Sequence, residues 1–502
     1  MSIRENLQLK ANARIDGRQE LIHKLGLTAN ESITDEELIL HAYEAWGTDC
    51  VKYLIGDFAF AISDGQQLFC ARDHFGVKPF FYTHVDGNFN FSSTLNELRG
   101  VSNTLNEIAV GDYLLFGVNQ DNSTTIFGDI QRLPPGHTLT VANNEIKVRC
   151  YWTPSLPAEV RFRDSESYVE RFSELFSRAV KDRLRTDRVA ISMSGGLDST
   201  SLAAIACEHT SVAGFTVVYD KLIPDEERHY STLAGEHLGI PVTHLNADRY
   251  SLFDGEMDQP EPFLVSALTG QFNDLLRLCA EFSSVALTGY DGDALMHEPE
   301  PASFRIKTRI RRMLRSADLL PEWVDESFAK QTNLQERWEQ FWSNRVDAGK
   351  RPAAMRTLNS KIWTSLFEGY DRGATKLNLD VRHPFLDIRL IEYLLAIPTK
   401  PWCVNKHILR RAMSNKLPTA VLNRPKTGLK DDPAVQLVQR ASVRWLDSFE
   451  VSPQLRAFVN LNRRRPVAEE RTSDALWASL RVFALNYWLT NSQSKMETMH
   501  GT

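Results

Sequence analysis

The sequence is poor in cysteine and contains no long apolar run. Its six cysteines are scattered, with no Cys-x-x-Cys pair, so neither a zinc site nor a redox-active disulfide is predicted. No apolar stretch reaches the roughly 18 residues that indicate a membrane-spanning helix. The first residues, Met1–Asn6, lack the apolar segment of a signal peptide. We therefore expect a cytoplasmic protein that does not contact a membrane.

An excess of basic residues is also missing. The chain has 58 Lys and Arg against 64 Asp and Glu, a formal net charge of −6. This balance argues against a general nucleic-acid-binding protein. A length of 502 residues predicts more than one domain.

The predicted elements change character near residue 150. Apolar runs separated by turns, such as Phe58–Ile62 and Leu68–Ala71, predict a mostly β region over residues 1–152. Beyond a linker at Pro154–Pro157, strands alternate with helices as far as Thr288, and the remainder is mostly helical. This alternation predicts a parallel sheet. We expect a mixed α/β chain (α+β overall) with two domains, 1–152 and 153–502.

The most informative motif is Ser-Gly-Gly-Leu-Asp-Ser-Thr at 194–200. It follows the apolar run Val189–Ile191, a predicted buried strand, and precedes a predicted helix, Ser201–Glu208. A strand, a small-residue turn and a helix together point backbone N–H groups at an anion, and the two glycines allow a phosphate to approach closely. Three hydroxyl groups add donors, and Asp198 offers a carboxylate to a metal ion bound to the phosphates. No Gly-Lys-Ser/Thr follows, so this is not a Walker A loop.

A second small, acidic turn follows another predicted strand. Ser284–Thr288 leads into Gly-Tyr-Asp-Gly-Asp at 289–293. Ligands of parallel sheets bind at the carboxyl ends of the strands, so the two turns are expected to meet. Asp198 and Asp293 would then hold Mg²⁺ between carboxylates and phosphates.

Several motifs of the first domain resemble the N-terminal amidotransferase domain of asparagine synthetases. They are Ala13–Arg18, Gly56–Phe60, Arg72–Tyr82 and Leu133–His137. The resemblance implies a β-sandwich of the N-terminal-nucleophile (Ntn) hydrolase type, which hydrolyses glutamine with an N-terminal cysteine. Here residue 2 is Ser, and no cysteine precedes Cys50. We therefore expect a degenerate remnant without glutaminase activity, in which Ser2 is not a nucleophile.

The second half resembles the synthetase domain of the same family. The loop at 194–200 is similar to the pyrophosphate-binding loop (PP-loop) of adenine nucleotide α-hydrolase-like enzymes. Together with 289–293, it forms an ordered set with His383–Asp387, Lys406–Arg411 and Arg424–Lys426. The resemblance implies that ATP adenylates a carboxylate, that pyrophosphate leaves, and that an amine attacks to form an amide.

The resemblance assigns a role to individual residues of this sequence. The resemblance implies that Asp198 and Asp293 bind Mg²⁺ and that Lys426 stabilises charge on the departing pyrophosphate. The adenine pocket would be lined by Ser192, Val217 and Gly289. The pyrophosphate would be held by Ser194, Gly195, Gly196, Asp198, Ser199 and Thr200.

The residue at position 290 bears on which amine attacks the acyl-adenylate. Asparagine synthetases have a glutamate at this position, whereas β-lactam synthetases pair a tyrosine with a glutamate to assist amine deprotonation. Glu368 is the candidate partner of Tyr290. Four stretches most resemble lasso peptide macrolactam cyclases: Trp363–Asp371, Val381–Asp387, Pro401–Val404 and Arg424–Thr427.

The leading hypothesis is therefore a lasso peptide cyclase. It would adenylate an Asp or Glu side chain of a precursor (core) peptide and join it to the peptide's N-terminal amine. A leader peptidase and a leader-recognition protein are possible partners; no nucleic acid or membrane partner is expected. The alternatives are an asparagine synthetase, a small-molecule amide or β-lactam synthetase, and a non-catalytic ATP-binding partner.

Overall fold

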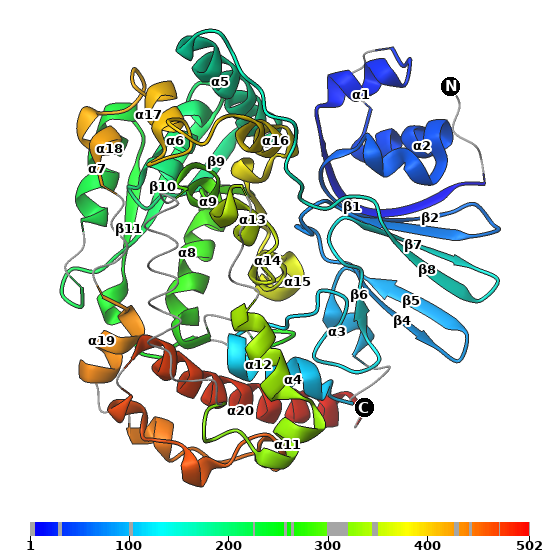
Figure 1. Cartoon of the computed structure of the whole chain (residues 1–502), viewed down its shortest axis with the longest axis vertical. Helices are drawn as coiled ribbons and strands as arrows, with labels where there is room; N and C mark the ends of the chain where they lie inside the picture. Colours follow the sequence, from blue (N-terminus) through cyan, green and yellow to red (C-terminus); the bar gives the residue numbers. More distant parts are fainter. Residues whose placement is uncertain are drawn as a thin grey trace.

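The computed structural model describes residues 6–28, 33–99, 104–223, 226–255, 259–262, 266–298, 320–343, 350–425, 431–440, 444–470 and 472–500. Figure 1 shows two sheet-containing parts side by side, with a helical region below the parallel sheet. No helix among these residues is long and apolar enough to cross a membrane.

The N-terminal part is built from two antiparallel sheets that pack face to face. The larger has the order β1-β2-β3-β7-β8 and the smaller β5-β4-β6. In β2, Phe58, Phe60 and Ile62 pack toward the helices α1 and α2, whereas Ala59 and Ala61 face the smaller sheet. This period of two is what a strand buried on both faces requires. The elements are β1 (Gln8–Asp16), α1 (Arg18–Lys24), α2 (Asp35–Trp46), β2 (Ile55–Ser63), β3 (Leu68–Arg72), β4 (Phe81–Val85), β5 (Asn88–Ser92), α3 (Leu95–Leu98), β6 (Gln131–Arg132), β7 (His137–Ala142) and β8 (Glu145–Cys150).

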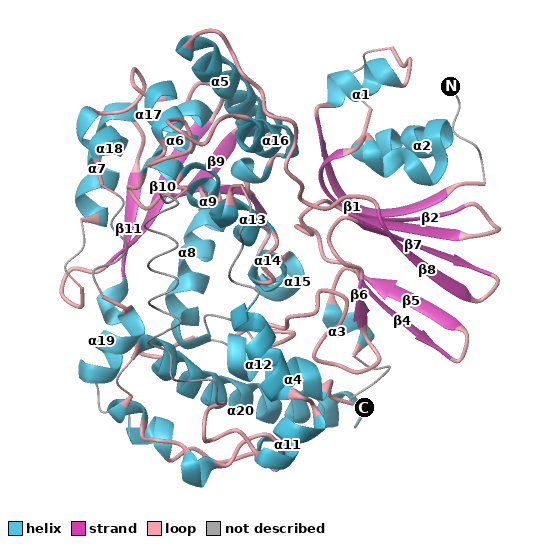
Figure 2. Cartoon of the chain, viewed as in Figure 1, coloured by secondary structure: helices cyan, strands magenta, loops and turns pink. Residues whose placement is uncertain are grey.

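The second sheet is entirely parallel, with the order β11-β10-β9-β12-β13. Val189 and Ile191 of the central strand pack against α5, α6 and α16, and Ala190 packs toward α8 on the opposite face, as Figure 2 shows for the helices. The predicted fold class is confirmed. The elements are α5 (Ser165–Asp182), β9 (Arg188–Ser192), α6 (Leu197–Ala206), β10 (Ser211–Val218), α7 (Glu227–Leu238), β11 (Val242–Asn246), α8 (Thr269–Phe282), β12 (Val285–Thr288), β13 (Asp380–Arg382) and α16 (Ile388–Ala396).

A helix of the N-terminal part packs into the C-terminal helical region. This helix, α4 (Glu107–Phe116), is absent from the predicted elements and lies against α12 (Leu334–Ser343) and α20 (Ser473–His500). A Cβ on Gly111 would lie 2.5 Å from a methyl carbon of Leu334, so glycine allows this close packing. The two parts therefore share one apolar cluster. The other helices of this region are α9 (Gly292–Met296), α11 (Glu326–Gln331), α13 (Pro352–Leu358), α14 (Ile362–Tyr370), α15 (Arg372–Thr375), α17 (His407–Ala412), α18 (Thr419–Asn423) and α19 (Pro433–Arg440).

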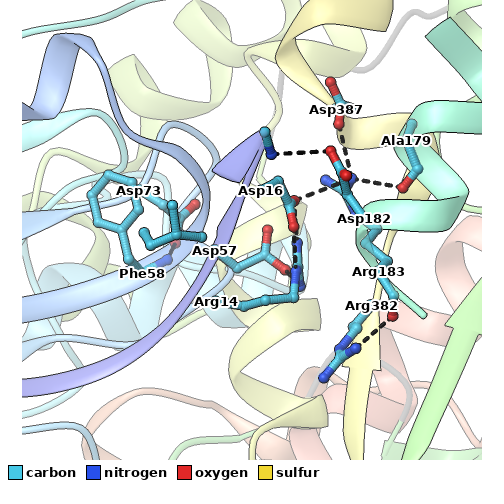
Figure 3. A network of polar contacts seen from close by, with 12 residues as sticks. Arg14, Asp16, Asp57, Phe58, Asp73, Ala179, Asp182, Arg183, Arg382 and Asp387 are labelled. Atoms are coloured by element: carbon cyan, nitrogen blue, oxygen red, sulfur yellow. Dashed lines mark hydrogen bonds and ion pairs between the residues drawn. The ribbon is translucent and has the colours of Figure 1, made fainter. Parts of the chain in front are cut away.

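Buried ion pairs join the two parts (Figure 3). Arg14 of β1 binds Asp16 at 2.9 Å and Asp57 at 2.5 Å. Arg183, after α5, reaches Asp387 at 2.9 Å and Asp16 at 3.3 Å. Removing one member of such a buried set leaves an uncompensated charge, so this network fixes how the N-terminal part sits on the parallel sheet.

Candidate active site

The phosphate-binding loop lies at the carboxyl end of the central strand β9, as predicted. Gly195 has a φ of 65°, and a Cβ there would lie 2.8 Å from the backbone nitrogen of Ser231, so glycine is required. Ser194 N–H donates to Oγ of Ser199 at 3.1 Å, which closes the turn. The helix begins at Leu197 rather than at Ser201, because the extended Gly196 acts as its N-cap.

This earlier start places three predicted ligands on the first turn of α6. Asp198, Ser199 and Thr200 follow Leu197 directly, where unpaired backbone N–H groups and the helix dipole favour an anion. The hydroxyl of Thr200 donates to the carbonyl of Gly196 at 2.9 Å. The first turn of the helix and the glycine turn thus form one surface whose geometry is suited to an anion.

The second acidic turn contacts the first, as predicted. A Cβ on Gly292 would lie 2.7 Å from Cγ of Asp198, and one on Gly289 would lie 3.1 Å from Cβ of Asp198. Asp293 opens α9. The two predicted metal-binding carboxylates, Asp198 and Asp293, therefore share one small region, where glycines leave room for the Asp198 side chain.

Lys406 lies between these two carboxylates. Its Nζ forms ion pairs with Asp198 and, at 2.5 Å, with Asp293. The residue is 7% exposed, and its backbone N–H donates to the carbonyl of Met296 at the end of α9. The motif Lys406–Arg411 is part of the family resemblance, but no local sequence pattern predicts the contact between this lysine and the acidic residues.

Asp291 is a third carboxylate in the same turn. It is 6% exposed and has a φ of 70°, unusual for a residue other than glycine. Neither of its carboxylate oxygens has a hydrogen-bond partner. Burial, together with Asp198 and Asp293, raises its pKa well above the usual range. A single sequence gives no signal that separates Asp291 from an ordinary turn residue.

The acidic region fits a divalent cation that the phosphates help to bind. No three acidic, histidine or cysteine side chains among the described residues are already gathered as metal ligands. Mg²⁺ commonly uses one or two carboxylates together with substrate phosphates, and Asp198 and Asp293 supply such a pair beside the phosphate loop. A bound Mg²⁺ would neutralise charge on the phosphates.

The three residues predicted to line the adenine pocket lie on adjacent strands. Ser192 ends β9, Val217 is near the end of β10, and Gly289 follows β12. Phe215 and Thr288 are the neighbours of Ser192 in the two strand pairs. The structure thus brings Ser192, Val217 and Gly289 to one edge of the sheet, beside the phosphate loop.

Tyr290 is paired with Tyr370 and not with Glu368. The two phenol oxygens are 2.9 Å apart. Tyr290 is 36% exposed, whereas Tyr370 is 8% exposed, and burial raises the pKa of both phenols. The carboxylate of Glu368 is bound instead by Arg72 and Arg132 of the N-terminal part. The predicted Tyr290–Glu368 pair is therefore corrected to Tyr290–Tyr370.

The geometry of α14 explains why Tyr370, and not Glu368, contacts Tyr290. Glu368 and Tyr370 both lie in the last turn of α14, and residues two apart on a helix point in different directions. Only one of them can face Tyr290. The ring of Tyr370 also packs near His383, with centroids 5.9 Å apart. Nδ1 of His383 is 2.6 Å from the Thr288 hydroxyl.

Two other predicted residues lie outside the described residues: Lys426 and Ser2. Two cysteines of the N-terminal part, Cys50 and Cys70, are not placed as nucleophiles. Cys50 and Cys70 are fully buried, and burial raises the pKa of Cys50 to about 12. Because the thiolate is the reactive form, neither thiol is suited to attack glutamine.

Comparison with known proteins gives two family matches. The asparagine synthase model matches residues 171–490, and the glutamine amidotransferase domain model matches residues 4–152. Asparagine synthetase [glutamine-hydrolyzing] 3 of Bacillus subtilis is 28% identical over 442 residues, which cover 79% of this chain and 70% of that protein. Asparagine synthetase [glutamine-hydrolyzing] 2 of the same organism is 26% identical over 475 residues, covering 84% and 62%.

A third relative matches a shorter stretch more closely. The putative asparagine synthetase [glutamine-hydrolyzing] 2 of Methanocaldococcus jannaschii is 33% identical over 234 residues, which cover 43% of this chain and 45% of that protein. The synthase model alone spans well over half of the sequence. With an anion-binding loop and an acidic turn meeting at the sheet edge, the chain belongs to the asparagine synthase family and is an ATP-dependent, amide-forming ligase.

Proposed function

We propose that this ligase is a lasso peptide cyclase. It would adenylate the side-chain carboxylate of an Asp or Glu in a precursor peptide. The peptide's own N-terminal amine would then form a macrolactam. The observation that carries this proposal is the Tyr290–Tyr370 pair, because Tyr290 lies in the acidic turn at the position where the family's asparagine synthetases have a glutamate.

The first half-reaction depends on the phosphate loop. A carboxylate oxygen of the peptide attacks the α-phosphorus of ATP, and the bond to the pyrophosphate oxygen breaks. The first turn of α6 and the loop N–H groups hold the pyrophosphate. Asp198 and Asp293 would bind Mg²⁺, and Lys426 would stabilise the departing charge.

The second half-reaction requires a neutral amine at the acyl carbon. The raised pKa of Tyr290 and Tyr370 keeps both phenols protonated near neutral pH, so they orient by hydrogen bonding and do not act as strong bases. An α-amino group has a pKa of about 7.7–8.0, so a useful fraction is already neutral. Such a site suits a peptide N-terminus. The C–N bond forms, the amine proton is lost, and AMP leaves.

A covalent link between the amine and the carboxylate also favours amide formation. When both groups belong to one peptide, their attack is effectively intramolecular, which lowers the barrier through proximity. A separate ammonia source is then unnecessary, consistent with the burial of Cys50 and Cys70 in the N-terminal part. A leader peptidase and a leader-recognition protein would deliver the freed core peptide.

A second candidate is an asparagine synthetase, or another small-molecule amide or β-lactam synthetase, that uses an external or small-molecule amine. The names of the Bacillus subtilis relatives favour it. A non-catalytic ATP-binding protein would release no pyrophosphate.

Mass spectrometry of the purified protein with ATP and Mg²⁺ separates these functions. One reaction contains leaderless peptides with a free N-terminus and an internal Asp or Glu, and the other contains aspartate with ammonia or glutamine. A cyclase yields peptide that has lost one water, together with AMP and pyrophosphate. Asparagine formation without peptide dehydration would contradict the proposal.

A further inference from the structure

Two arginines of the N-terminal part bind both carboxylate oxygens of Glu368. Arg132 binds it through two parallel contacts, Nε to Oε1 at 2.8 Å and Nη2 to Oε2 at 2.9 Å. Arg72 adds Nη2 to Oε1 at 3.2 Å. Bidentate arginine–carboxylate pairs fix orientation as well as supplying energy. The position of Glu368 is therefore set by residues far from it in sequence.

The two arginines are themselves fixed in place. Arg72 is fully buried and donates to the carbonyls of Lys78, Leu133 and Gly76 at 2.8–2.9 Å. Its remaining contact is with Glu368. Arg132 is 2% exposed and stacks over the ring of Phe81, 5.4 Å from its centroid.

Glu261 completes this cluster. It forms an ion pair with Arg132 and accepts the backbone N–H of Ile126 at 2.5 Å. Two guanidinium groups thus face two carboxylates. Loss of Glu368 would leave an excess positive charge in a buried position, which is costly.

The cluster meets α14 at the turn that carries Tyr370. Glu368 and Tyr370 are both in the last turn of this helix. The carbonyl of Glu368 accepts the N–H of Asp371 at 3.3 Å. The ring of Phe367, next to Glu368, packs 4.8 Å from that of His383. Fixing Glu368 therefore fixes the direction in which Tyr370 points.

We propose that Glu368 is a positioning residue through which Arg72 and Arg132 hold Tyr370 against Tyr290. The N-terminal part is then a working component of the ligase site, even without glutaminase chemistry. Its role is to orient the last turn of α14. The catalytic consequence rests on the proposed function, whereas the orientation itself does not.

The matched control is Asp35, another carboxylate that joins the two parts. It binds Arg185 through two contacts of 2.9 and 2.8 Å. Its side chain is 13% exposed, the same as that of Glu368. Asp35 makes these contacts away from α14. Asp35→Asn therefore removes a similar inter-part ion pair without touching the proposed connection.

The first experiment needs no substrate. With 3-fluorotyrosine at position 290 of the full chain, the ¹⁹F resonance should shift in Glu368→Gln and Arg132→Lys. It should stay at the wild-type position in Asp35→Asn. An unchanged resonance in both α14-linked variants, or an equal shift in Asp35→Asn, would overturn the proposal whatever reaction the enzyme catalyses.

The second experiment uses the cyclisation assay. Losing the contact between the phenols should cost one ordinary hydrogen bond, so Glu368→Gln should lower kcat about fivefold to tenfold. KM for ATP should stay unchanged, because the phosphate loop is untouched. Glu368→Gln should add nothing further in a Tyr370→Phe background. A full additional loss there, or a parallel rise in KM for ATP, would show that Glu368 does not act through Tyr370.

Discussion

Lys406→Met tests whether the acidic region is a cation site. Lys406 is 7% exposed, and its ammonium pairs with both Asp198 and Asp293. Removing one member of a buried ion pair typically costs about 3–5 kcal/mol. Solvent already screens part of this cluster because the side chain of Asp293 is 47% exposed. The free energy of unfolding should therefore fall by an amount at the lower end of this range, about 3 kcal/mol. Methionine keeps most of the side-chain length, so packing is largely preserved.

Mg²⁺ should restore part of this loss. Without the ammonium, the carboxylates of Asp198, Asp291 and Asp293 repel one another and attract a divalent cation more strongly. Mg²⁺ at about ten times its dissociation constant should return about 1.4 kcal/mol. Denaturant unfolding with chelator and with Mg²⁺ measures both effects. The wild type should respond less, because its lysine competes with the cation.

The control is Lys416→Met. Lys416 pairs with Glu208 on the surface, with side chains 38% and 43% exposed. Exposed pairs contribute only about 0–1 kcal/mol, and Lys416→Met, which keeps Lys406, should respond to Mg²⁺ only as weakly as the wild type does. If Lys406→Met is as stable as wild type, or if Mg²⁺ restores it no more than it stabilises Lys416→Met, the cation site is refuted.

Three further predictions test the site and the buried core. Asp198→Ala and Lys426→Ala should each abolish amide formation although both variants remain folded; normal turnover by either would contradict the site assignment. Gly195→Ala forces a Cβ to 2.8 Å from the backbone nitrogen of Ser231 at a φ of 65°, so equilibrium binding should show ATP affinity at least about tenfold weaker. Burial lowers the pKa of His383 to about 3. As the pH falls below 6.5, His383 is therefore protonated in the unfolded state while it stays neutral in the folded state. Stability should therefore fall between about pH 6.5 and 3, by about 1.4 kcal/mol per pH unit, with a shallower dependence in His383→Asn.

The strands and turns could be predicted because their signals are local. Val189–Ile191 is an apolar run that Gly195 and Gly196 follow closely, and Ser284–Thr288 ends at a small acidic turn. Each pattern lies within about ten residues and has a direct physical meaning. A parallel sheet then places both turns at the same edge, which is where the structure has Asp198 and Asp293. The predicted start of α6 at Ser201 is wrong, because Gly196 caps the helix and Leu197–Thr200 already belong to it.

The contacts that decide the chemistry were not predictable in this way. Lys406 is more than 200 residues from Asp198, and Arg132 is 236 residues from Glu368. No local pattern encodes such pairs. Glu368 and Tyr370 illustrate the problem most clearly. Both residues lie in the segment expected to supply the partner of Tyr290, and glutamate is the more familiar partner for an active-site tyrosine. Which of the two contacts Tyr290 depends on which side of α14 faces the N-terminal part.

This dependence gives the N-terminal part a physical role that does not involve glutamine hydrolysis. Arg72 can be supported by three backbone carbonyls only if the turn from Gly76 to Lys78 and the strand before Leu133 are folded. Those segments belong to the amidotransferase-like part. Substitutions that abolish glutamine hydrolysis leave them intact, whereas deleting the part would leave Glu368 without its arginines and α14 without its orientation. The ligase site therefore requires the fold of the N-terminal part whether or not that part hydrolyses glutamine.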